Sequence, residues 1–95
     1  MFDLGKVLIT AGINHNLETG AVSHQDIQAI IIKHLNNIDD NKYPEDREAN
    51  QEAINNNFGR VLTVHNINDL RIYCITEGLG SPEDIYTTVL LTEEY

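Results

Sequence analysis

Residues 71–77 read RIYCITE, and our prediction of the fold starts from this segment. It is rich in β-branched and aromatic residues and alternates between two faces, as β-strands do. The stretch RVLTVH (60–65) precedes it across the turn-forming residues NIND (66–69), and IYTTVLL (85–91) follows it after a loop. Three strands in succession along the chain predict an antiparallel meander.

The apolar period changes from 2 to 3.6 residues on the N-terminal side of these strands. Ser23 and Asp26 have the spacing of a capping box at a helix start. A second helix is predicted to begin at Pro44, a residue favoured in the first turn, and to end before Gly59. Behind the capping box, one apolar stripe follows at helical spacing, made of Ile27, Ile30, Ile31, His34, Leu35 and Ile38.

The remaining N-terminal residues carry weaker signals. KVLIT (6–10) is a short strand candidate, and INHNLET (13–19) is predicted to be a turn or a single helical turn. We therefore expect one α+β domain over residues 1–95. It consists of a three-stranded antiparallel C-terminal meander, optionally with a short N-terminal strand, packed against two helices.

Charge is the strongest bulk feature of the chain. Fifteen Asp and Glu residues against six Lys and Arg give a net charge of −9. Direct binding to nucleic acid is disfavoured, because affinity for phosphates comes from Lys and Arg. No apolar run approaches the ~20 residues that span a bilayer, and the N-terminal stretch does not resemble a signal peptide. We expect a cytoplasmic protein without membrane contact, in which the single cysteine, Cys74, is a small buried apolar residue.

Two patches hold most of the acidic residues. The first runs over residues 39–52, and the second comprises Glu77, Glu83, Asp84, Glu93 and Glu94. One interpretation is that both patches are solvated and serve solubility. The other is that they form a surface matched to a basic protein partner, since complementary charge raises the rate and specificity of association.

Both faces of the last predicted strand carry apolar residues that could make contacts. In IYTTVLLTEEY (85–95) neither face is wholly polar, so one can meet the helices while the other meets a partner. A strand at the end of a chain can also be a sheet edge, which Glu93 and Glu94 would guard with charge. A second copy of the chain is an alternative partner. The residues that we predict to bind a protein partner are Glu45, Asp46, Glu48, Tyr73, Tyr86, Glu93, Glu94 and Tyr95.

The sequence shows no recognisable catalytic or metal-binding motif. Its four histidines lack the i, i+4 spacing of helical metal ligands, and we expect no enzyme activity, no cofactor and no metal site. His34 is predicted to lie at the core boundary with a backbone partner. An alternative function is binding of a small molecule or nucleotide, or a role as a minor enzyme subunit. It would use Tyr73, His65, Thr87 and Thr88 on a concave sheet.

Three segments together resemble a known family. EDREAN (45–50), GRVLTVHNINDLRIYCITE (59–77) and TTVLLTEEY (87–95) are similar to small uncharacterised, plasmid-related proteins carried on plasmids, integrative elements and phages. The match covers residues 45–95 well and residues 1–44 loosely.

This chain departs from the family pattern at several positions. Tyr73 stands in place of a Trp, His65 in place of a Tyr and Thr92 in place of a Pro. The connection EGLGSPED (77–84) is longer than the family's and lacks its Arg. The resemblance implies a mobile-element setting and no particular reaction.

Two hypotheses about function follow. The first is a non-enzymatic, acidic interaction protein of a mobile genetic element. Its sharpest form is an anti-defence inhibitor that occupies the nucleic-acid groove of a host nuclease. The second is the small-molecule binder. A pocket on the sheet would favour the second hypothesis, and a flat acidic face would favour the first.

Overall fold

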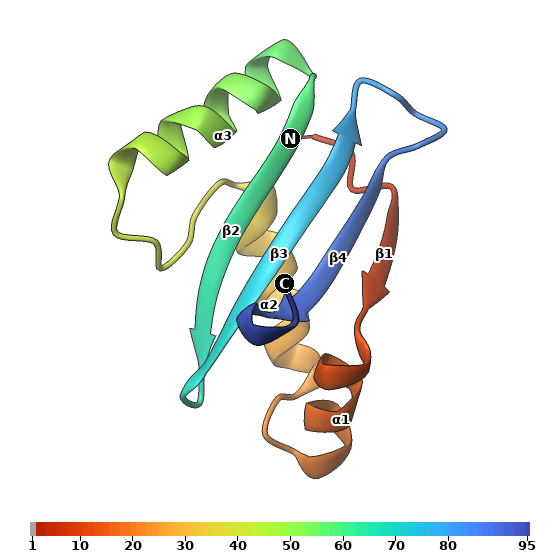
Figure 1. Cartoon of the computed structure of the whole chain (residues 1–95), viewed down its shortest axis with the longest axis vertical. Coiled ribbons are helices and arrows are strands. Elements are labelled where there is room, and N and C mark those ends of the chain that lie inside the picture. The colour runs from red at the N-terminus through yellow and green to blue at the C-terminus, as the bar shows by residue number, and fades with distance from the viewer. Residues whose placement is uncertain (1) are drawn as a thin grey trace.

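A computed structural model describes residues 2–95, and these residues form an α+β structure with three α-helices and one four-stranded mixed sheet. The sheet order is β1-β4-β3-β2, with α2 behind the sheet in Figure 1. The elements are β1 (Lys6–Ile9), α1 (Ala11–Thr19), α2 (His24–Leu35), α3 (Pro44–Asn56), β2 (Gly59–Ile67), β3 (Leu70–Leu79), β4 (Tyr86–Leu91) and the 3-10 helix η1 (Thr92–Glu94).

The predicted antiparallel pairing over residues 60–91 is confirmed. Thr63 of β2 lies opposite Cys74 of β3, and Cys74 lies opposite Val89 of β4. A two-residue turn, Asn68 and Asp69, joins β2 to β3, and both residues have positive φ (48° and 69°). Positive φ at both positions is the signature of a type I′ turn, which matches the twist of the strands and favours Asn and Asp. The turn residues of NIND therefore help to set the register of the hairpin.

The sheet differs from the predicted three-stranded meander because β1 joins it as a fourth strand. β1 runs parallel to β4, with Val7 opposite Thr87. Parallel neighbours need a long connection, and the chain between β1 and β4 supplies one by passing through all the other elements. A strand of four residues carries no local signal for its partner, so the sequence pattern could not place it.

α2 covers one face of the sheet, as predicted. Ile30 of α2 packs in one buried cluster with Ile72 and Cys74 of β3 and with Val89 of β4. The prediction that Cys74 is a buried apolar residue is confirmed, and burial raises the pKa of its thiol to about 12. Because side chains alternate along a strand, Tyr73 points to the opposite face of the sheet.

The predicted capping box at the start of α2 is confirmed. The Asp26 N–H donates to Ser23 Oγ at 3.0 Å, and the Ser23 N–H donates to the Asp26 carboxylate at 3.0 Å. Replacing Ser23 with alanine should therefore lower the free energy of unfolding by about 1 kcal/mol. Urea unfolding measures this change, with Ser81→Ala in an exposed loop as the matched control. An unchanged midpoint for Ser23→Ala would contradict a role for this cap.

The other two helices differ from the prediction. α1 is a nine-residue helix rather than a turn or single helical turn. It begins after Thr10, whose hydroxyl accepts from the Ile13 N–H at 3.4 Å, and it ends at Gly20 with a φ of 83°. α3 lies beside the edge strand β2 instead of over the face of the sheet, and its residues Ala53 and Ile54 pack against β2 and β3 (Figure 1). The spacing of apolar residues shows which side of a helix is buried. It does not show whether that side packs on the face of a sheet or against its edge strand.

Side chains close the outer edge of β2. Asn50 of α3 donates to the Leu62 carbonyl at 2.8 Å and accepts from the Leu62 N–H at 3.1 Å. The Asp39 carboxylate accepts from the Val64 N–H at 3.0 Å, and the Asp40 N–H donates to the Val64 carbonyl at 2.9 Å. The Asp40 carboxylate accepts from the next outward N–H along β2 at 2.9 Å. Asp39 and Asp40 therefore have a structural role as caps of a strand edge, and of the two Asp40 is exposed.

Candidate interaction surface

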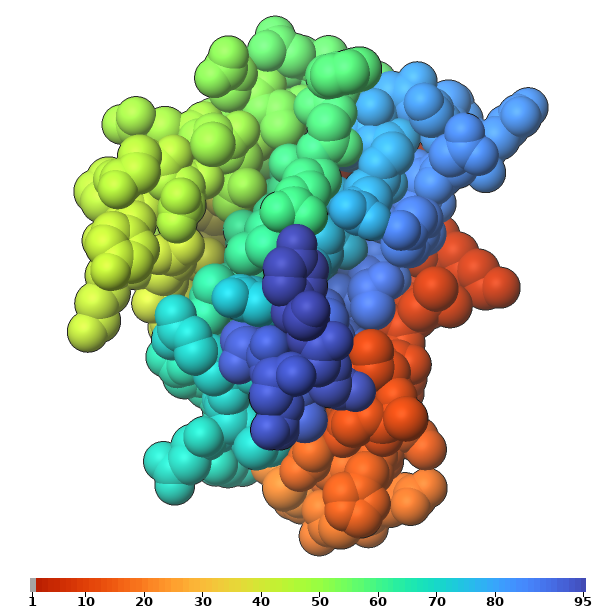
Figure 2. Space-filling model, in the orientation of Figure 1, coloured from red at the N-terminus to blue at the C-terminus, as the bar shows by residue number. Residues whose placement is uncertain are grey.

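The face of the sheet away from α2 carries an aromatic cluster. The chain turns back after β4, and η1 places Tyr95 over this face (Figure 1). The Tyr95 ring meets Tyr73 of β3 edge-on, with 5.4 Å between the ring centres. Figure 2 shows the C-terminal residues, in dark blue, standing out from the middle of this surface. The predicted grouping of Tyr73 and Tyr95 is therefore present, and Tyr95 remains 65% exposed.

Polar contacts extend the cluster across three strands. Arg60 of β2 donates to the Tyr95 hydroxyl at 2.9 Å and lies 3.7 Å from the Glu77 carboxylate on β3. The hydroxyl of Tyr86, on β4, donates to Glu77 at 2.5 Å. These hydrogen bonds raise the pKa of Arg60, through Tyr95, and the pKa of Tyr86, through Glu77. We call Arg60, Tyr73, Glu77, Tyr86 and Tyr95 the tyrosine surface.

The hollow at the centre of this face, beside Tyr95, is too small to enclose a ligand. It measures about 160 Å³ and is lined by side chains that include Tyr86, Thr88 and Tyr95. Sites for small molecules are usually ~300–1,000 Å³. A larger hollow, of about 590 Å³, lies elsewhere, where Ile38, Tyr43 and other residues of the α2–α3 connection meet α3. Two further hollows, of about 300 and 370 Å³, border Arg60 at the margins of this face. The centre of the sheet face is therefore a surface for contact with another protein and not an enclosed ligand site, and a small-molecule site on this face would have to lie at its margin.

The residues proposed for small-molecule binding do not form one site. His65 and Thr87 are buried on the face under α2, whereas Tyr73 and Thr88 point to the open face. The register explains this separation, since Tyr73 lies opposite Val64 and therefore shares a face with it, not with His65. These four residues therefore lie on opposite faces of the sheet, and of the four only Tyr73 and Thr88 reach the open face.

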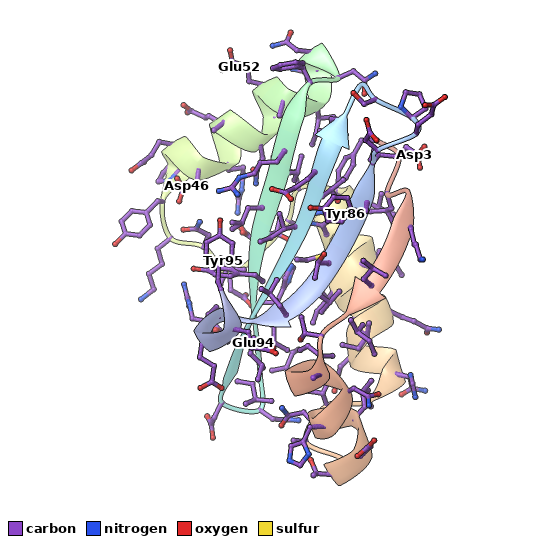
Figure 3. The ribbon with its side chains drawn as sticks, turned by 45° about the vertical axis from the view of Figure 1, so that its right-hand side comes forward. Asp3, Asp46, Glu52, Tyr86, Glu94 and Tyr95 are labelled. Carbon is purple, nitrogen blue, oxygen red and sulfur yellow. The ribbon has the colours of Figure 1, made fainter. Side chains whose placement is uncertain are left out.

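The predicted acidic residues of α3 lie on two sides of the helix. Glu45 and Glu48 are exposed, and with Glu52 they follow i, i+3, i+7 spacing along one side of the helix. Asp46 accepts from the Asn41 side chain at 2.9 Å. Figure 3 shows Asp46 and Glu52 along α3, with Tyr95 on the sheet beside it.

A hollow joins α3 to the tyrosine surface. It measures about 300 Å³, and its lining includes Asp46 of α3 and Arg60 of β2. Asp46 therefore borders the same surface as Tyr95, which Arg60 contacts directly. The structure thus brings Asp46 and the tyrosines, which are far apart in sequence, to one surface, whereas Glu48 lines the hollow at the α2–α3 connection.

Glu93 and Glu94 do not guard a sheet edge, because β1 pairs with the outer side of β4. Glu94 is instead an internal link. Its carboxylate accepts from the Thr10 hydroxyl at 2.7 Å, the Leu91 N–H at 2.9 Å and the Gly12 N–H at 3.1 Å, and these bonds lower its pKa. A Cβ at Gly12 would come within 2.6 Å of this carboxylate, so glycine permits the contact. Glu93 is exposed and remains a candidate for partner contact.

A buried polar network, which the sequence did not predict, lies between α2 and the sheet. His34 Nδ1 is 2.7 Å from the Thr63 hydroxyl, and His34 Nε2 is 2.8 Å from the Thr76 hydroxyl. Thr63 continues to His65 Nε2 at 2.8 Å, and Thr76 continues to Thr87 at 2.7 Å. All five side chains are buried. The expectation that His34 sits at the core boundary with a backbone partner is wrong, because it is fully buried and bonded to threonines.

The end of the network determines the direction of its hydrogen bonds. Thr87 donates to the Leu4 carbonyl at 2.7 Å, so its hydroxyl oxygen accepts from Thr76. Thr76 in turn accepts from His34 Nε2–H, which leaves Nδ1 to accept from Thr63. A neutral imidazole satisfies this arrangement, and burial lowers the pKa of His34 to about 4. The network has no access for a substrate, so we assign it to stability.

Two observations concern metal binding and membrane insertion. Residues 2–95 contain no group of three or more His, Cys, Asp or Glu side chains placed to hold a metal ion. In the same part of the chain, no helix combines the length and apolar character needed to cross a membrane.

We compared the chain with known protein families, proteins and solved structures. No family model, curated protein or solved structure gives a significant match to this chain.

Proposed function

We propose that the protein is a non-enzymatic interaction protein that binds a basic surface on a partner protein. The observation that carries this proposal is the excess of unpaired acid. Within residues 2–95, two of the fifteen acidic side chains, Asp39 and Glu77, make ion pairs. Such a field attracts cationic partners and raises the association rate. The adjoining tyrosine surface supplies anchors of the type that contribute most binding energy at interfaces.

The partner class follows from the spacing of the acids and from the family resemblance. Glu45, Glu48 and Glu52 present carboxylates on successive turns of one exposed helix. A row of negative charges of this kind suits a groove that normally holds a phosphate backbone. The mobile-element setting rests on the resemblance to plasmid-related proteins that the sequence pattern of residues 45–95 suggests. We therefore propose a host defence nuclease as the partner, with this protein as its inhibitor.

The proposal predicts separable effects of the acids and the tyrosines on binding kinetics. Reversing Glu45, Glu48 and Glu52 to lysine should slow association about tenfold at low salt, because long-range attraction mainly sets the on-rate. Tyr95→Ala should instead raise the off-rate about tenfold, as expected for the loss of an aromatic anchor. The partner is first captured from the native host and identified by mass spectrometry. Surface plasmon resonance across a salt series then measures both rates.

Two matched controls come from the chain itself. Reversal of Glu18, Glu83 and Asp84 makes the same change of net charge away from α3. Tyr43→Ala removes a tyrosine that is 64% exposed but lies outside the tyrosine surface. An acidic partner, or association rates that ignore salt and the α3 reversals, would contradict the proposal. In that case the acidic residues serve solubility alone.

A further inference from the structure

The two edges of the sheet differ in how far other parts of the chain cover their backbone groups. Side chains from the 39–50 region cover the outer edge of β2, as described above. At the opposite edge, Val7, Leu8 and Ile9 of β1 are 41%, 41% and 42% exposed. β1 forms the outer rim beside β4 in Figure 1, and the red N-terminal segment lies at the same rim in Figure 2. An uncovered apolar edge strand is a template for pairing with another chain.

The hydrogen-bonding groups on this edge can be identified. The Thr10 N–H donates to the Val89 carbonyl of β4 at 3.2 Å. In a parallel ladder the inward and outward residues alternate, so Leu8 also faces β4. The N–H and C=O groups of Val7 and Ile9 therefore point outward, and they have no backbone partner among residues 2–95. Two residues thus offer four unpaired backbone groups in a row.

We propose that two copies of this chain pair through β1, antiparallel about a two-fold axis at Leu8, to form a continuous eight-stranded sheet. Val7 of each copy then lies opposite Ile9 of the other, and the two pairs exchange four N–H···O=C bonds. The exposed Val7 and Ile9 side chains cover each other on the helix side of the sheet. The two Leu8 side chains meet on the open side.

Charge complementarity favours a second copy as the occupant of this edge. In the proposed register Lys6 lies opposite Thr10 of the other copy, on the same face of the sheet. The Thr10 hydroxyl donates a hydrogen bond to the Glu94 carboxylate at 2.7 Å, so this carboxylate lies next to Thr10. Lys6 has no ion pair among residues 2–95. The two-fold axis therefore places a lysine beside a carboxylate twice. These pairs offset part of the repulsion between two chains of charge −9.

Site-specific disulfide formation tests both the dimer and its register. Antiparallel residues in a non-hydrogen-bonded pair have Cα atoms ~4.5 Å apart, which a disulfide can bridge. Leu8→Cys sits on the proposed axis, whereas Lys6→Cys would lie opposite Thr10. Under mild oxidation, Leu8→Cys should form covalent dimer at least about tenfold faster than Lys6→Cys. The native Cys74 is buried and should not react. Equal rates for the two variants would overturn the proposal.

Measurements of mass test the interface without a cross-link. Sedimentation equilibrium of the native chain should show twice the 10.7 kDa of one copy. Lys6→Glu should weaken the dimer at least about tenfold, and Lys6→Arg should preserve it. Ile9→Pro removes an outward N–H at an edge, where proline is tolerated, and should give a folded monomer by circular dichroism. A native chain that stays monomeric into the millimolar range, or unchanged association of folded Lys6→Glu and Ile9→Pro, would refute the pairing.

Discussion

Replacing His34 with alanine is expected to lower the free energy of unfolding by about 2–5 kcal/mol. The change removes a fully buried side chain and leaves the hydroxyl of Thr63 without an acceptor. Thr76→Val isolates the polar part of this loss, because it keeps the side-chain shape but leaves the His34 Nε2–H unpaired. We expect about 1–3 kcal/mol for Thr76→Val.

Chemical denaturation with circular dichroism measures both variants. Thr88→Val is the matched control, since Thr88 lies on the open face and takes no part in the network. Its unfolding midpoint should stay close to that of the native chain. If Thr76→Val were as stable as Thr88→Val, the network would contribute nothing to stability, and its hydrogen bonds would only replace those made with water.

The same measurement repeated across pH should show the cost of charging His34. Its pKa is about 4 in the folded chain, below the ordinary value near 6.5, so the fold favours the neutral ring. The corresponding stability is present above pH 6.5 and is lost as the pH falls from 6.5 through 4. The full loss amounts to about 3 kcal/mol. Burial lowers the pKa of His65 as well, which adds to the loss in the same direction. His34→Ala should remove the part of this pH dependence that His34 contributes and leave the part that comes from His65 and from Glu94, whose pKa is lowered by its hydrogen bonds.

Replacing Asn50 with aspartate is expected to lower the free energy of unfolding by about 1–3 kcal/mol and to promote aggregation. The native amide donates to the Leu62 carbonyl and to Asn37 Oδ1, at 2.8 and 3.1 Å. A carboxylate of the same size can still accept from the Leu62 N–H, but it would face both oxygens without a proton. Weakening this contact also frees the edge of β2 for pairing with other chains.

Denaturation midpoints and light scattering during incubation test this prediction. Asn55→Asp is the matched control on the same helix, because Asn55 is exposed and accepts from Gln51, as aspartate also can. Only the Asn50 substitution should lower the midpoint and increase scattering. Equal behaviour of the two variants would show that Asn50 does not hold α3 to the sheet edge.

The elements that depend on local signals could be predicted from the amino-acid sequence. The alternation over residues 70–76 and 85–91 predicts paired strands, and NIND marks the turn between β2 and β3, which the structure narrows to Asn68 and Asp69. The capping box at Ser23 predicts the start of α2 to the residue. Each of these signals depends on neighbours within a few positions, so a single segment contains the whole pattern.

The way in which those elements pack together could not be predicted from local signals. β1 has too few residues to specify β4 as its partner, and the helical period of α3 did not distinguish the edge of β2 from the face of the sheet. The tyrosine surface draws on three strands and the C-terminal residue. The polar network likewise joins His34 to threonines 29 and 42 residues away. These contacts depend on which faces and edges of the elements lie next to each other in space. Such long-range proximity produces no periodic pattern of residues in the sequence.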